Sequence, residues 1–489
     1  MLFNFFNFIF YFLPIAIFSY VLFILSRNTK YFLLSFSILS LFFYAYWNWK
    51  YVFLIITSII FNYLISIKIS ENIKKNKYLI IGIFGNLLIL SYFKYTNFII
   101  ENINLLTNFD IQSKNIALPL AISFFTFQQI GYLSDLRNNK IKKNSFYNYF
   151  LFVTFFPQLI AGPIVKNSEF IPQLKKITKT KKIFIKNFIK GSSLFIIGIF
   201  KKNFLADNLE KIATPIFDSS LSFSQINFFE QWIGLLAYSF QIYFDFSAYS
   251  DMAIGLALIF GFKFPFNFNS PYKSSSIIEF WKKWHITLSR FINEYLFNFL
   301  SLWLFRKNFF NFKNVNNTFV NIFISAIITF SISGLWHGPS WNFILWGFLH
   351  GIYIYINFIY KNYINNNTNF NLIFYKFLTF LCVIIAWVPF RSQNLEITKN
   401  YYLSLLGVNS NFNFNFNIIS SDDYFGLLIL FISFIICFIF KNSNSFFKNH
   451  KNFFTLNFDY VSGLKIFIIL ILIIFFGLKK AEPFIYFQF

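Results

Sequence analysis

Residues 330–351 read FSISGLWHGPSWNFILWGFLHG, an apolar stretch of the kind found in membrane helices. The stretch holds two of the chain's four histidines, His337 and His350, and three of its ten tryptophans. Its glycines form two Gly-x-x-x-Gly pairs, Gly334 with Gly338 and Gly347 with Gly351. Such pairs let neighbouring helices approach closely, and an ionisable side chain inside a membrane segment is a candidate functional site. A closely packed helix pair whose histidines bond only to their neighbours is the alternative interpretation.

The rest of the chain has the composition of a membrane protein. Of its 489 residues, 57% are hydrophobic and 12% are charged, whereas soluble domains carry about 25% charged residues. Apolar runs of about 20 residues recur along the whole length, which predicts an all-α polytopic membrane protein. The net charge of +24 comes from lysines clustered between these runs. Such clusters are typical of cytoplasmic loops, so we expect no nucleic-acid partner.

About 11 transmembrane helices are expected, since each crossing needs about 20 residues. The apolar runs that supply them are 2–25, 31–47, 51–67, 78–100, 117–133, 184–200, 228–262, 320–345, 346–360, 372–390, 424–440 and 464–478. Early in the chain, basic loops at 27–30 and 68–77 alternate with a more acidic segment at 101–115. Because cytoplasmic loops carry the excess of Lys and Arg, this order predicts an extracytoplasmic N-terminus. No basic region precedes the first run, so we interpret it as an uncleaved helix.

One apolar run is interrupted. Residues 146–164 contain Pro157, Gly162 and Pro163, and basic segments flank them on both sides. Both flanks have the character of cytoplasmic loops, which a single crossing cannot satisfy, so we expect a broken, re-entrant hairpin. Irregular backbone at membrane depth requires surrounding protein or water. A pair of short spans or an interfacial segment is the alternative.

Polar segments separate several of the runs. We expect a polar loop outside the membrane at 203–225. Residues 277–304 are mixed and amphipathic, which favours a helix at an interface or against other helices. Asparagine-rich segments at 362–371 and 409–417 predict low-complexity loops. All of these belong to one integral-membrane domain, residues 1–489.

Motifs for nucleotide or metal chemistry are missing from the sequence. It contains no Walker-type Gly-x-x-x-x-Gly-Lys, no His-Glu-x-x-His and no Cys-x-x-Cys, the patterns that would indicate such sites. Cys382 and Cys437 each lie in an apolar run, which favours buried structural thiols over a disulfide. We therefore expect neither a bound metal nor a bound cofactor.

Polar side chains inside the apolar runs are the remaining candidates. Asp245 and Asp251 would each cost about 2.5–3.5 kcal/mol if exposed to lipid. We therefore expect both to face the protein interior, either paired or hydrated. Gln128 and Gln241 are weaker candidates of the same kind. For all four, the alternative is a structural role in which buried hydrogen bonds hold the helices together.

The histidines differ from these groups in kind. His337 lies in an apolar run and His285 in the mixed segment 277–304. At membrane depth, burial would disfavour the charged imidazolium. A neutral imidazole can take a proton from a hydroxyl while an acyl group is transferred. We interpret His350, on the helix after His337, as structural, and His450, in a basic polar loop, as solvated.

Several stretches together resemble one family, the membrane-bound O-acyltransferases, and within it the bacterial branch of alginate and peptidoglycan O-acetyltransferase membrane subunits. The catalytic-core motifs fall in residues 115–351, and the tail also matches. The matching stretches are SFFTFQ at 123–128 with Tyr132 and Asp135, FFPQLIAGPI at 155–164, QIYFDFSAYSDM at 241–252, NFNSPY at 267–272, FWKKWHITLS at 280–289, LWHG at 335–338 and FIYFQF at 484–489. Ala248 stands where the family usually has glycine, and Pro339 where it usually has alanine.

The resemblance implies both a fold and a site. The helices would ring a central funnel or tunnel, with re-entrant segments. His337 would be the catalytic histidine and His285 the second active-site histidine. Residues that line the tunnel or support the structure would be Asp245, Asp251, Gln128, Asn269, Trp284 and Trp336. The donor would be acetyl-CoA or another acyl thioester.

The same resemblance implies a cellular setting. The protein would lie in the bacterial cytoplasmic (inner) membrane among its lipids. It would pass acetyl groups from the cytoplasmic side towards an exported or cell-wall polysaccharide. A periplasmic or other extracytoplasmic acetyltransferase, similar to serine hydrolases, would be its partner and would complete the transfer.

Other functions stay open on the sequence. D-alanyl or other acyl transfer to teichoic acid would use the same histidine motif. A transporter would instead use Asp245 and Asp251 as a proton or ion relay and would tolerate the loss of His337. Inverted internal repeats would support a transporter, and we find none in the sequence. A scaffold for a secretion complex would tolerate the loss of either active-site histidine.

Overall fold

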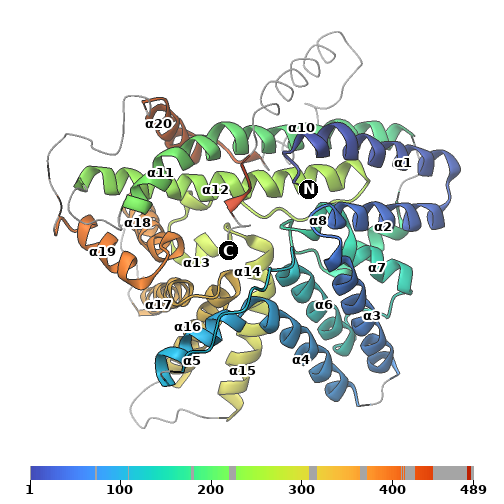
Figure 1. Ribbon diagram of the computed structural model, residues 1–489, viewed down its shortest axis with the longest axis horizontal. Coiled ribbons are helices and arrows are strands. Elements are labelled where there is room, and N and C mark those ends of the chain that lie inside the picture. The colour runs from blue at the N-terminus through green and yellow to red at the C-terminus, as the bar shows by residue number, and fades with distance from the viewer. Residues whose placement is uncertain are drawn as a thin grey trace. The chain divides into compact units, whose positions relative to one another are not determined.

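A computed structural model describes most of the chain, and its regular elements are helices (Figure 1). The described residues are 2–71, 74–107, 109–177, 181–219, 227–307, 317–363, 372–408, 410, 412, 424–443 and 482–485. Outside them lie the predicted span 464–478, His450, nearly all of the two asparagine-rich segments and the last four residues of the tail. The predicted all-α class is confirmed for the described part.

Seven of the described helices are long and apolar enough to cross a membrane. They are Phe8–Ser26, Lys50–Ser70, Lys75–Lys94, Phe228–Ile259, Asn317–His337, Trp341–Asn362 and Leu372–Arg391. Each overlaps a predicted apolar run. Two shorter apolar helices, Thr29–Ala45 and Tyr424–Phe438, match two more of the runs. The chain is therefore a multi-pass membrane protein.

The chain folds as two compact units. Unit 1 comprises residues 1–199, 249–266 and 449–483, and unit 2 comprises 200–248, 267–448 and 484–489. The long helix α12, Phe228–Ile259, contributes its first two thirds to unit 2 and its end to unit 1. Almost all of its most apolar stretch is buried.

Unit 1 contains most of the N-terminal helices. These are η1 (Phe8–Phe12), α1 (Leu13–Ser26), α2 (Thr29–Ala45), α3 (Lys50–Ser70), α4 (Lys75–Lys94), α5 (Thr96–Thr107), α6 (Ile122–Arg137), α7 (Phe146–Thr154), α8 (Phe156–Leu159), α9 (Asn167–Lys175) and α10 (Lys181–Phe200). Polar contacts join neighbours among them. The buried amides of Asn62 on α3 and Asn86 on α4 donate to each other's carbonyl oxygen, at 3.1 and 2.7 Å. Such pairs satisfy polar groups between membrane helices.

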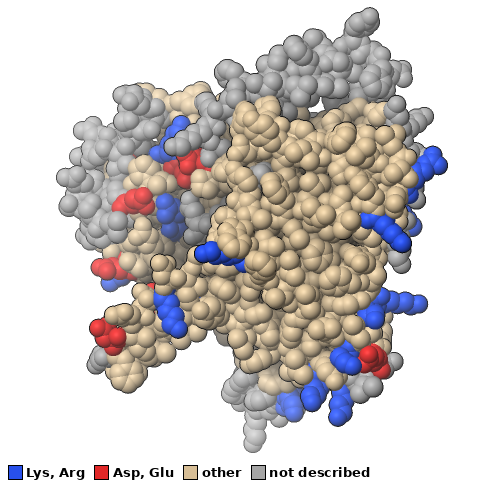
Figure 2. All heavy atoms as spheres, turned by 45° about the vertical axis from the view of Figure 1, so that its right-hand side comes forward, with Lys and Arg blue, Asp and Glu red and all other residues tan. Residues whose placement is uncertain are grey.

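The surface of the N-terminal helices suits a lipid environment. Large apolar side chains that are more than half exposed include Ile15, Phe18, Leu25, Leu34, Ile38, Phe42, Phe53, Ile80 and Phe84. Figure 2 shows one face of the molecule on which a broad area carries few charged side chains, while lysines and arginines gather towards its lower and right-hand margins. In a soluble protein so large an apolar surface would be unusual.

The interrupted run is a broken helix, as predicted. Helix α7 ends at Thr154, Phe155 adopts a non-helical conformation with ψ 109°, and the short α8 follows with Pro157 in its first turn. Residues 151–165 are all buried. The break therefore lies inside protein, which is where irregular backbone is tolerated in a membrane protein.

Unit 2 contains the remaining elements. They are η2 (Lys201–Ala206), α11 (Asp207–Ser219), η3 (Pro271–Lys273), α13 (Ile277–Trp281), α14 (Ile286–Ile292), η4 (Asn293–Phe297), α15 (Asn298–Lys307), α16 (Asn317–His337), α17 (Trp341–Tyr363), α18 (Leu372–Arg391), α19 (Leu395–Leu405) and α20 (Tyr424–Phe438). Figure 1 shows α16 and α17 side by side.

The two Gly-x-x-x-Gly pairs lie where α16 and α17 meet. A methyl group added to Gly334 would collide with the carbonyl of Phe343, and one added to Gly347 would collide with the carbonyl of Phe330. Because backbone atoms occupy the space that a side chain would need, only glycine allows this close approach. The predicted role of the glycines is confirmed.

Several predicted boundaries are wrong. The predicted loop 203–225 is mostly helical, as η2 and α11. Its apolar residues Leu209, Ile212, Ala213 and Ile216 are all buried, and their spacing of three and four residues is a helical face that the polar composition concealed. The predicted span 78–100 ends at Lys94, and α5 then continues to Thr107.

Two further helices are interrupted where the sequence predicts continuity. The amphipathic segment 277–304 is divided into α13, α14, η4 and α15, with its first break at residues 282–285. The run 320–345 ends as a helix at His337, and a turn at Gly338–Ser340 precedes α17. Pro339 explains the second break, because proline disfavours helical conformation in the residue before it. Both breaks place a histidine at the end of a helix.

Candidate active site

His337 closes α16 inside an aromatic pocket. Its imidazole is 6% exposed. The ring centroids of Trp336, Trp346 and Phe390 lie 4.9, 5.2 and 5.3 Å from that of His337, all in edge-on arrangements. Trp346 comes from α17 and Phe390 from the end of α18. Residues from three helices thus surround the imidazole with apolar surface, and predicted site residue Trp336 is one of them.

The position of α17 and α18 beside His337 is fixed by buried polar contacts. The amide of Asn342 in the first turn of α17 donates to the carbonyl of Ser392 at 2.7 Å, and its oxygen accepts from Thr398 Oγ1 at 3.3 Å. These bonds join the start of α17 to the end of α18 and to α19. The turn that follows His337 is therefore held from two sides.

His285 occupies the break between α13 and α14. Its backbone has φ 41° and ψ 53°, a left-handed conformation that costs a non-glycine residue about 1–2 kcal/mol. The side chain is 1% exposed. Its Nδ1 lies 3.1 Å from Oδ1 of Asn267, and the ring of Phe246 meets it edge-on at 4.6 Å. Burial lowers the pKa of His285 to about 3, so the imidazole is neutral throughout the physiological range.

A chain of ring contacts, edge-on, stacked and tilted in turn, runs from His337 to Trp284, the neighbour of His285. Trp346, beside His337, lies 6.0 Å from Trp387, and Trp387 lies 5.0 Å from Trp284, which precedes His285. Trp284, Trp346 and Trp387 are almost wholly buried. The structure therefore places His337, His285, Trp284 and Trp336 in one aromatic cluster of unit 2. Apolar surroundings of this kind exclude water.

His350 is bound differently from the other two. The indole Nε1 of Trp281 donates to His350 Nδ1 at 3.3 Å, and the side chain is fully buried. This contact joins α13 to α17 and agrees with the structural role expected for His350.

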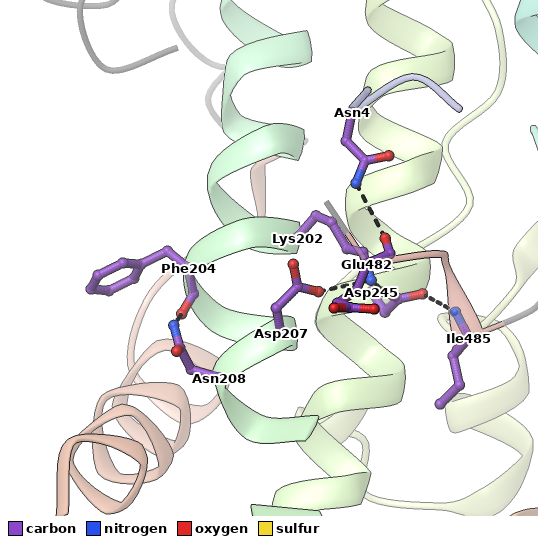
Figure 3. A network of polar contacts seen from close by, with 8 residues as sticks. All are labelled: Asn4, Lys202, Phe204, Asp207, Asn208, Asp245, Glu482 and Ile485. Atoms are coloured by element: carbon purple, nitrogen blue, oxygen red, sulfur yellow. Dashed lines mark hydrogen bonds and ion pairs between the residues drawn. The ribbon is translucent and has the colours of Figure 1, made fainter. Parts of the chain in front are cut away.

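Asp245 is part of a charged network within unit 2 (Figure 3). Its Oδ1 lies 2.6 Å from Lys202 Nζ, and its Oδ2 accepts the backbone N–H of Ile485 at 2.9 Å. Lys202 also pairs with Asp207 at 2.8 Å and lies 5.0 Å from the centre of the Phe484 ring. Lys202 and Asp245 are each about 1% exposed. The carboxylate is thus paired, one of the two states expected, and these contacts tie η2 and the segment around Ile485 to α12.

The other predicted polar residues differ in unit, burial and contacts. Asp251 is buried and belongs to unit 1. Gln128, also in unit 1, is half-buried, and its amide donates to the carbonyl of Phe152 at 3.3 Å, just before the break after α7. Gln241 is buried on α12. Asn269 has an exposed side chain, and its backbone N–H donates to the carbonyl of Lys283 at 3.0 Å.

Sequence reasoning missed four residues of these sites. Asn267, Trp387 and Phe390 contact the histidines or their neighbours, and Lys202 holds Asp245. Lys202 directly follows the apolar run 184–200, and no sequence signal marks it as buried. Asn267 lies in the quoted stretch 267–272, but that segment is irregular, and no periodicity indicates which of its asparagines faces inward.

Among the described residues, no group of three or more His, Cys, Asp and Glu side chains could hold a metal ion. The chemistry available at the cluster is that of imidazole: accepting a proton or a hydrogen bond, and returning it.

Comparisons with known proteins agree on one family. The model of the membrane-bound O-acyltransferase family, MBOAT, matches residues 125–397. The peptidoglycan O-acetyltransferase of Helicobacter pylori is 37% identical over 91% of this chain and 90% of its own length. The probable alginate O-acetylase AlgI of Pseudomonas aeruginosa is 36% identical over 81% of this chain and 73% of its own length. The teichoic acid D-alanyltransferase of Bacillus subtilis is 28% identical over 47% of this chain and 56% of its own length.

The matched residues 125–397 include both histidines of the aromatic cluster and the helices that position them. The family match covers more than half of the chain, and two relatives match it along most of their length. This chain belongs to the membrane-bound O-acyltransferase family and is an O-acyltransferase, whose substrates include an acyl donor.

Proposed function

We propose that this enzyme transfers acetyl groups for the O-acetylation of an exported or cell-wall polysaccharide. Its relatives at 37% and 36% identity, a peptidoglycan O-acetyltransferase and a probable alginate O-acetylase, support acetyl as the group and a polysaccharide as the acceptor. The donor in this proposal is acetyl-CoA or another cytoplasmic acyl thioester. Neither a metal nor a bound cofactor takes part in the proposed reaction.

His337 is the proposed catalytic histidine. The observation that carries this role is its burial in an aromatic pocket, in the same cluster as His285, within the residues that match the family. In the reaction, Nδ1 or Nε2 of His337 takes the proton of an acceptor hydroxyl. The hydroxyl oxygen forms a bond to the acyl carbon, the carbon–sulfur bond breaks, and the thiolate leaves with the proton from the imidazolium. General-base assistance of this kind is worth about 10²–10⁴ in rate.

His285 is the proposed second histidine, which assists or positions the reactants. Trp284 and Trp336 line the same cluster, and Asp245, Asp251 and Gln128 support the surrounding helices in this proposal. Asn269 has no part in it, because its side chain is exposed.

The proposed setting is the cytoplasmic membrane of a bacterium. About 11 spans, each of about 20 residues, would ring a central funnel or tunnel, with an extracytoplasmic N-terminus and a re-entrant hairpin at 146–164. An extracytoplasmic acetyltransferase similar to serine hydrolases is the proposed partner that completes transfer to the polymer. The basic loops at 27–30 and 68–77 support the orientation.

The test is the ester-linked acetate on surface glycans of cells that carry His337→Ala. We expect a loss of about 10²–10⁴-fold, with the variant inserted in the membrane at the normal level. His450→Ala is the matched control, because the sequence around that histidine is basic and polar, and it should keep full activity. Full acetylation by a normally inserted His337→Ala protein would overturn the assignment.

D-alanyl transfer to teichoic acid is the second candidate. It is favoured by the 28% identity to a teichoic acid D-alanyltransferase, although that match covers 47% of this chain. The same cells distinguish the two, because base-labile D-alanine instead of acetate would then be the ester that depends on His337.

A further inference from the structure

The side-chain oxygen of Asn267 receives three polar contacts at the break before α14. The backbone N–H of Thr287 donates to Oδ1 at 3.1 Å, and the hydroxyl of Thr287 donates to it at 2.9 Å. The third contact is His285 Nδ1, at 3.1 Å. Because a backbone N–H can only donate, the atom that it meets is the amide oxygen and not the amide nitrogen. This removes the usual ambiguity in the orientation of an asparagine side chain.

The identity of that oxygen decides the state of the imidazole. An amide oxygen only accepts hydrogen bonds, so the ring nitrogen that faces it carries the proton. In a neutral imidazole the other nitrogen is then unprotonated. His285 is therefore the Nδ1–H tautomer, and Nε2 holds a free lone pair.

The same asparagine also holds the backbone of the break. Its carbonyl accepts the N–H of Ile286 at 2.9 Å, and the N–H of Asn269 donates to the carbonyl of Lys283 at 3.0 Å. Residues 267–269 thus run beside the left-handed turn at His285 and bond to it on either side. Asn267 therefore contacts both the ring of His285 and the backbone that follows it.

Two polar atoms of this pair are left for a ligand. His285 Nε2 and Asn267 Nδ2 are buried, and neither has a hydrogen-bond partner within the described part of the chain. Buried polar atoms without partners are rare in folded proteins and call for an explanation. One is an acceptor and the other a donor. A hydroxyl can donate to the first, and a carbonyl or hydroxyl oxygen can accept from the second.

We propose that Asn267 is a positioning residue of the acyl-transfer site: it holds His285 as the Nδ1–H tautomer, so that Nε2 accepts a hydrogen bond from the acceptor hydroxyl. His285 holds this hydroxyl while the acceptor binds; as the oxygen attacks the acyl carbon, the O–H turns from Nε2 of His285 to His337, which takes the proton. The low pKa of His285 agrees with this division, since burial makes its imidazole a poor final acceptor of the proton. The inference rests on the proposed function and extends it to the geometry of one hydrogen bond.

His350 provides an internal reference for the tautomer. Its Nδ1 accepts from the indole N–H of Trp281, and an indole N–H can only donate. A neutral His350 must therefore carry its proton on Nε2, the opposite of His285. The two buried histidines differ in tautomer because one faces an acceptor and the other a donor.

Nitrogen-15 NMR of the full-length protein, labelled at histidine, tests the tautomer directly. We expect the His285 signals, assigned by their loss in His285→Ala, to show a protonated Nδ1 and an unprotonated Nε2. His350 should show the reverse pattern. In Asn267→Leu the His285 pattern should change to a mixture or to the other tautomer, while the His350 pattern persists. A protonated Nε2 on His285 in the unmodified protein would overturn the inference.

Activity measurements test whether Asn267 acts through His285. In membranes supplied with radiolabelled acetyl-CoA, Asn267→Leu should lower kcat for formation of base-labile glycan acetate by about 10²-fold, the lower end of general acid–base assistance. The KM for acetyl-CoA should change by less than about twofold, because the donor is not bound by this pair. Asn267→Asp keeps an oxygen acceptor for Nδ1 and should recover most of the lost activity.

Two comparisons complete the design. The matched control is Asn269→Leu, the same substitution at the exposed neighbour, which should stay within about twofold of the unmodified protein. In a double-mutant cycle, Asn267→Leu should cost nothing further once His285 is Ala. A further loss in that background would show a separate structural role and overturn the inference while leaving the proposed function in place. Full activity of His285→Ala would instead overturn the role of His285 in the proposed function.

Discussion

Two buried polar clusters of unit 2 differ in how completely their polar atoms are paired. In the charged network, Lys202 meets Asp245 and Asp207, and the second oxygen of Asp245 accepts from Ile485. In the histidine cluster, His285 and Asn267 bond to each other and still leave one nitrogen apiece without a partner in the described residues. Both clusters are almost fully buried.

The difference separates a structural site from a site prepared for substrate. A buried charge without its partner costs several kcal/mol, so the lysine network is stable only when complete. A buried neutral imidazole without a partner costs less free energy than an unpaired charge, and its free lone pair can accept a hydrogen bond from a substrate. The sequence singles out Asp245 and the histidines alike. Only their contacts show that Asp245 is fully paired and that His285 keeps an open nitrogen.

The largest expected effect comes from removing the buried lysine of the charged network. Lys202→Met would remove the ammonium that pairs with the buried carboxylate of Asp245 and should lower the free energy of unfolding by about 3–5 kcal/mol. Thermal unfolding of the purified protein in detergent measures it. The control is Lys211→Met, because Lys211 is exposed and its ammonium donates to Asn208 at 3.2 Å. This variant should change stability by less than about 0.5 kcal/mol. Equal effects of the two substitutions would contradict the contrast between the clusters.

A steric change should affect the histidine cluster without removing any polar atom. Gly347→Ala would press a methyl group on the carbonyl of Phe330 and separate α16 from α17. We expect a loss of about 1–3 kcal/mol in stability. We also expect a fall of about 10²-fold in acyl transfer, because displacement by about 1 Å is that costly at a reaction centre.

The control for this steric change is the same substitution on another helix. A methyl group at Gly82 would meet the end of the Leu133 side chain, which can move. Gly82→Ala should therefore cost less in stability and leave acyl transfer near normal. If both glycine variants lose activity equally, the α16–α17 contact is not what positions His337.

The pH dependence of stability tests whether His285 is buried as a neutral group. Burial depresses the pKa of His285 to about 3 in the folded protein, from 6.5. Below pH 6.5 the unfolded chain therefore binds a proton that the folded chain cannot take, and stability falls as the pH is lowered towards 3. The loss is about 1.4 kcal/mol for each pH unit, or about 2 kcal/mol at pH 5. His285→Gln should lose correspondingly less than the unmodified protein between pH 7 and pH 5. Identical pH profiles would mean that His285 is not buried as a neutral group.

The smallest expected effect concerns the histidine that the structure assigns to packing. Trp281→Phe keeps an aromatic ring beside His350 but removes the hydrogen bond to its Nδ1. The loss of one such bond should cost about 1 kcal/mol in unfolding free energy, and acyl transfer should stay within about twofold. A large loss of transfer with little loss of stability would move His350 from packing to the active site.

Much of the architecture could be predicted from the sequence, because membrane helices are recognised by their length and apolar composition. All seven long apolar helices overlap predicted runs, and the break after α7 follows from Pro157 and its flanks. Helix α11 is not predicted, because Asp207 and Glu210 give the segment the polar composition of a loop. Its buried apolar residues nevertheless repeat every three or four positions, as on a helical face.

The candidate site could be predicted only in part. Motifs single out His285 and His337, since histidine is rare in this chain and each lies in a stretch that matches the family. Their partners come from elements far away in sequence: Asn267 from an irregular segment, and Phe390 from the end of α18. No local pattern encodes such pairing, because it depends on how the elements pack.

The bond between Ile485 and Asp245 has a consequence for how the protein is made. The two residues are 240 positions apart, so at about 5–20 residues per second the ribosome delivers the second roughly 10–50 s after the first. During that interval one oxygen of a carboxylate destined for the interior lacks its final donor. Unit 2 therefore completes its interior only after residues 482–485 have left the ribosome, and a reporter fused beyond them should be joined through a linker long enough to let that segment dock.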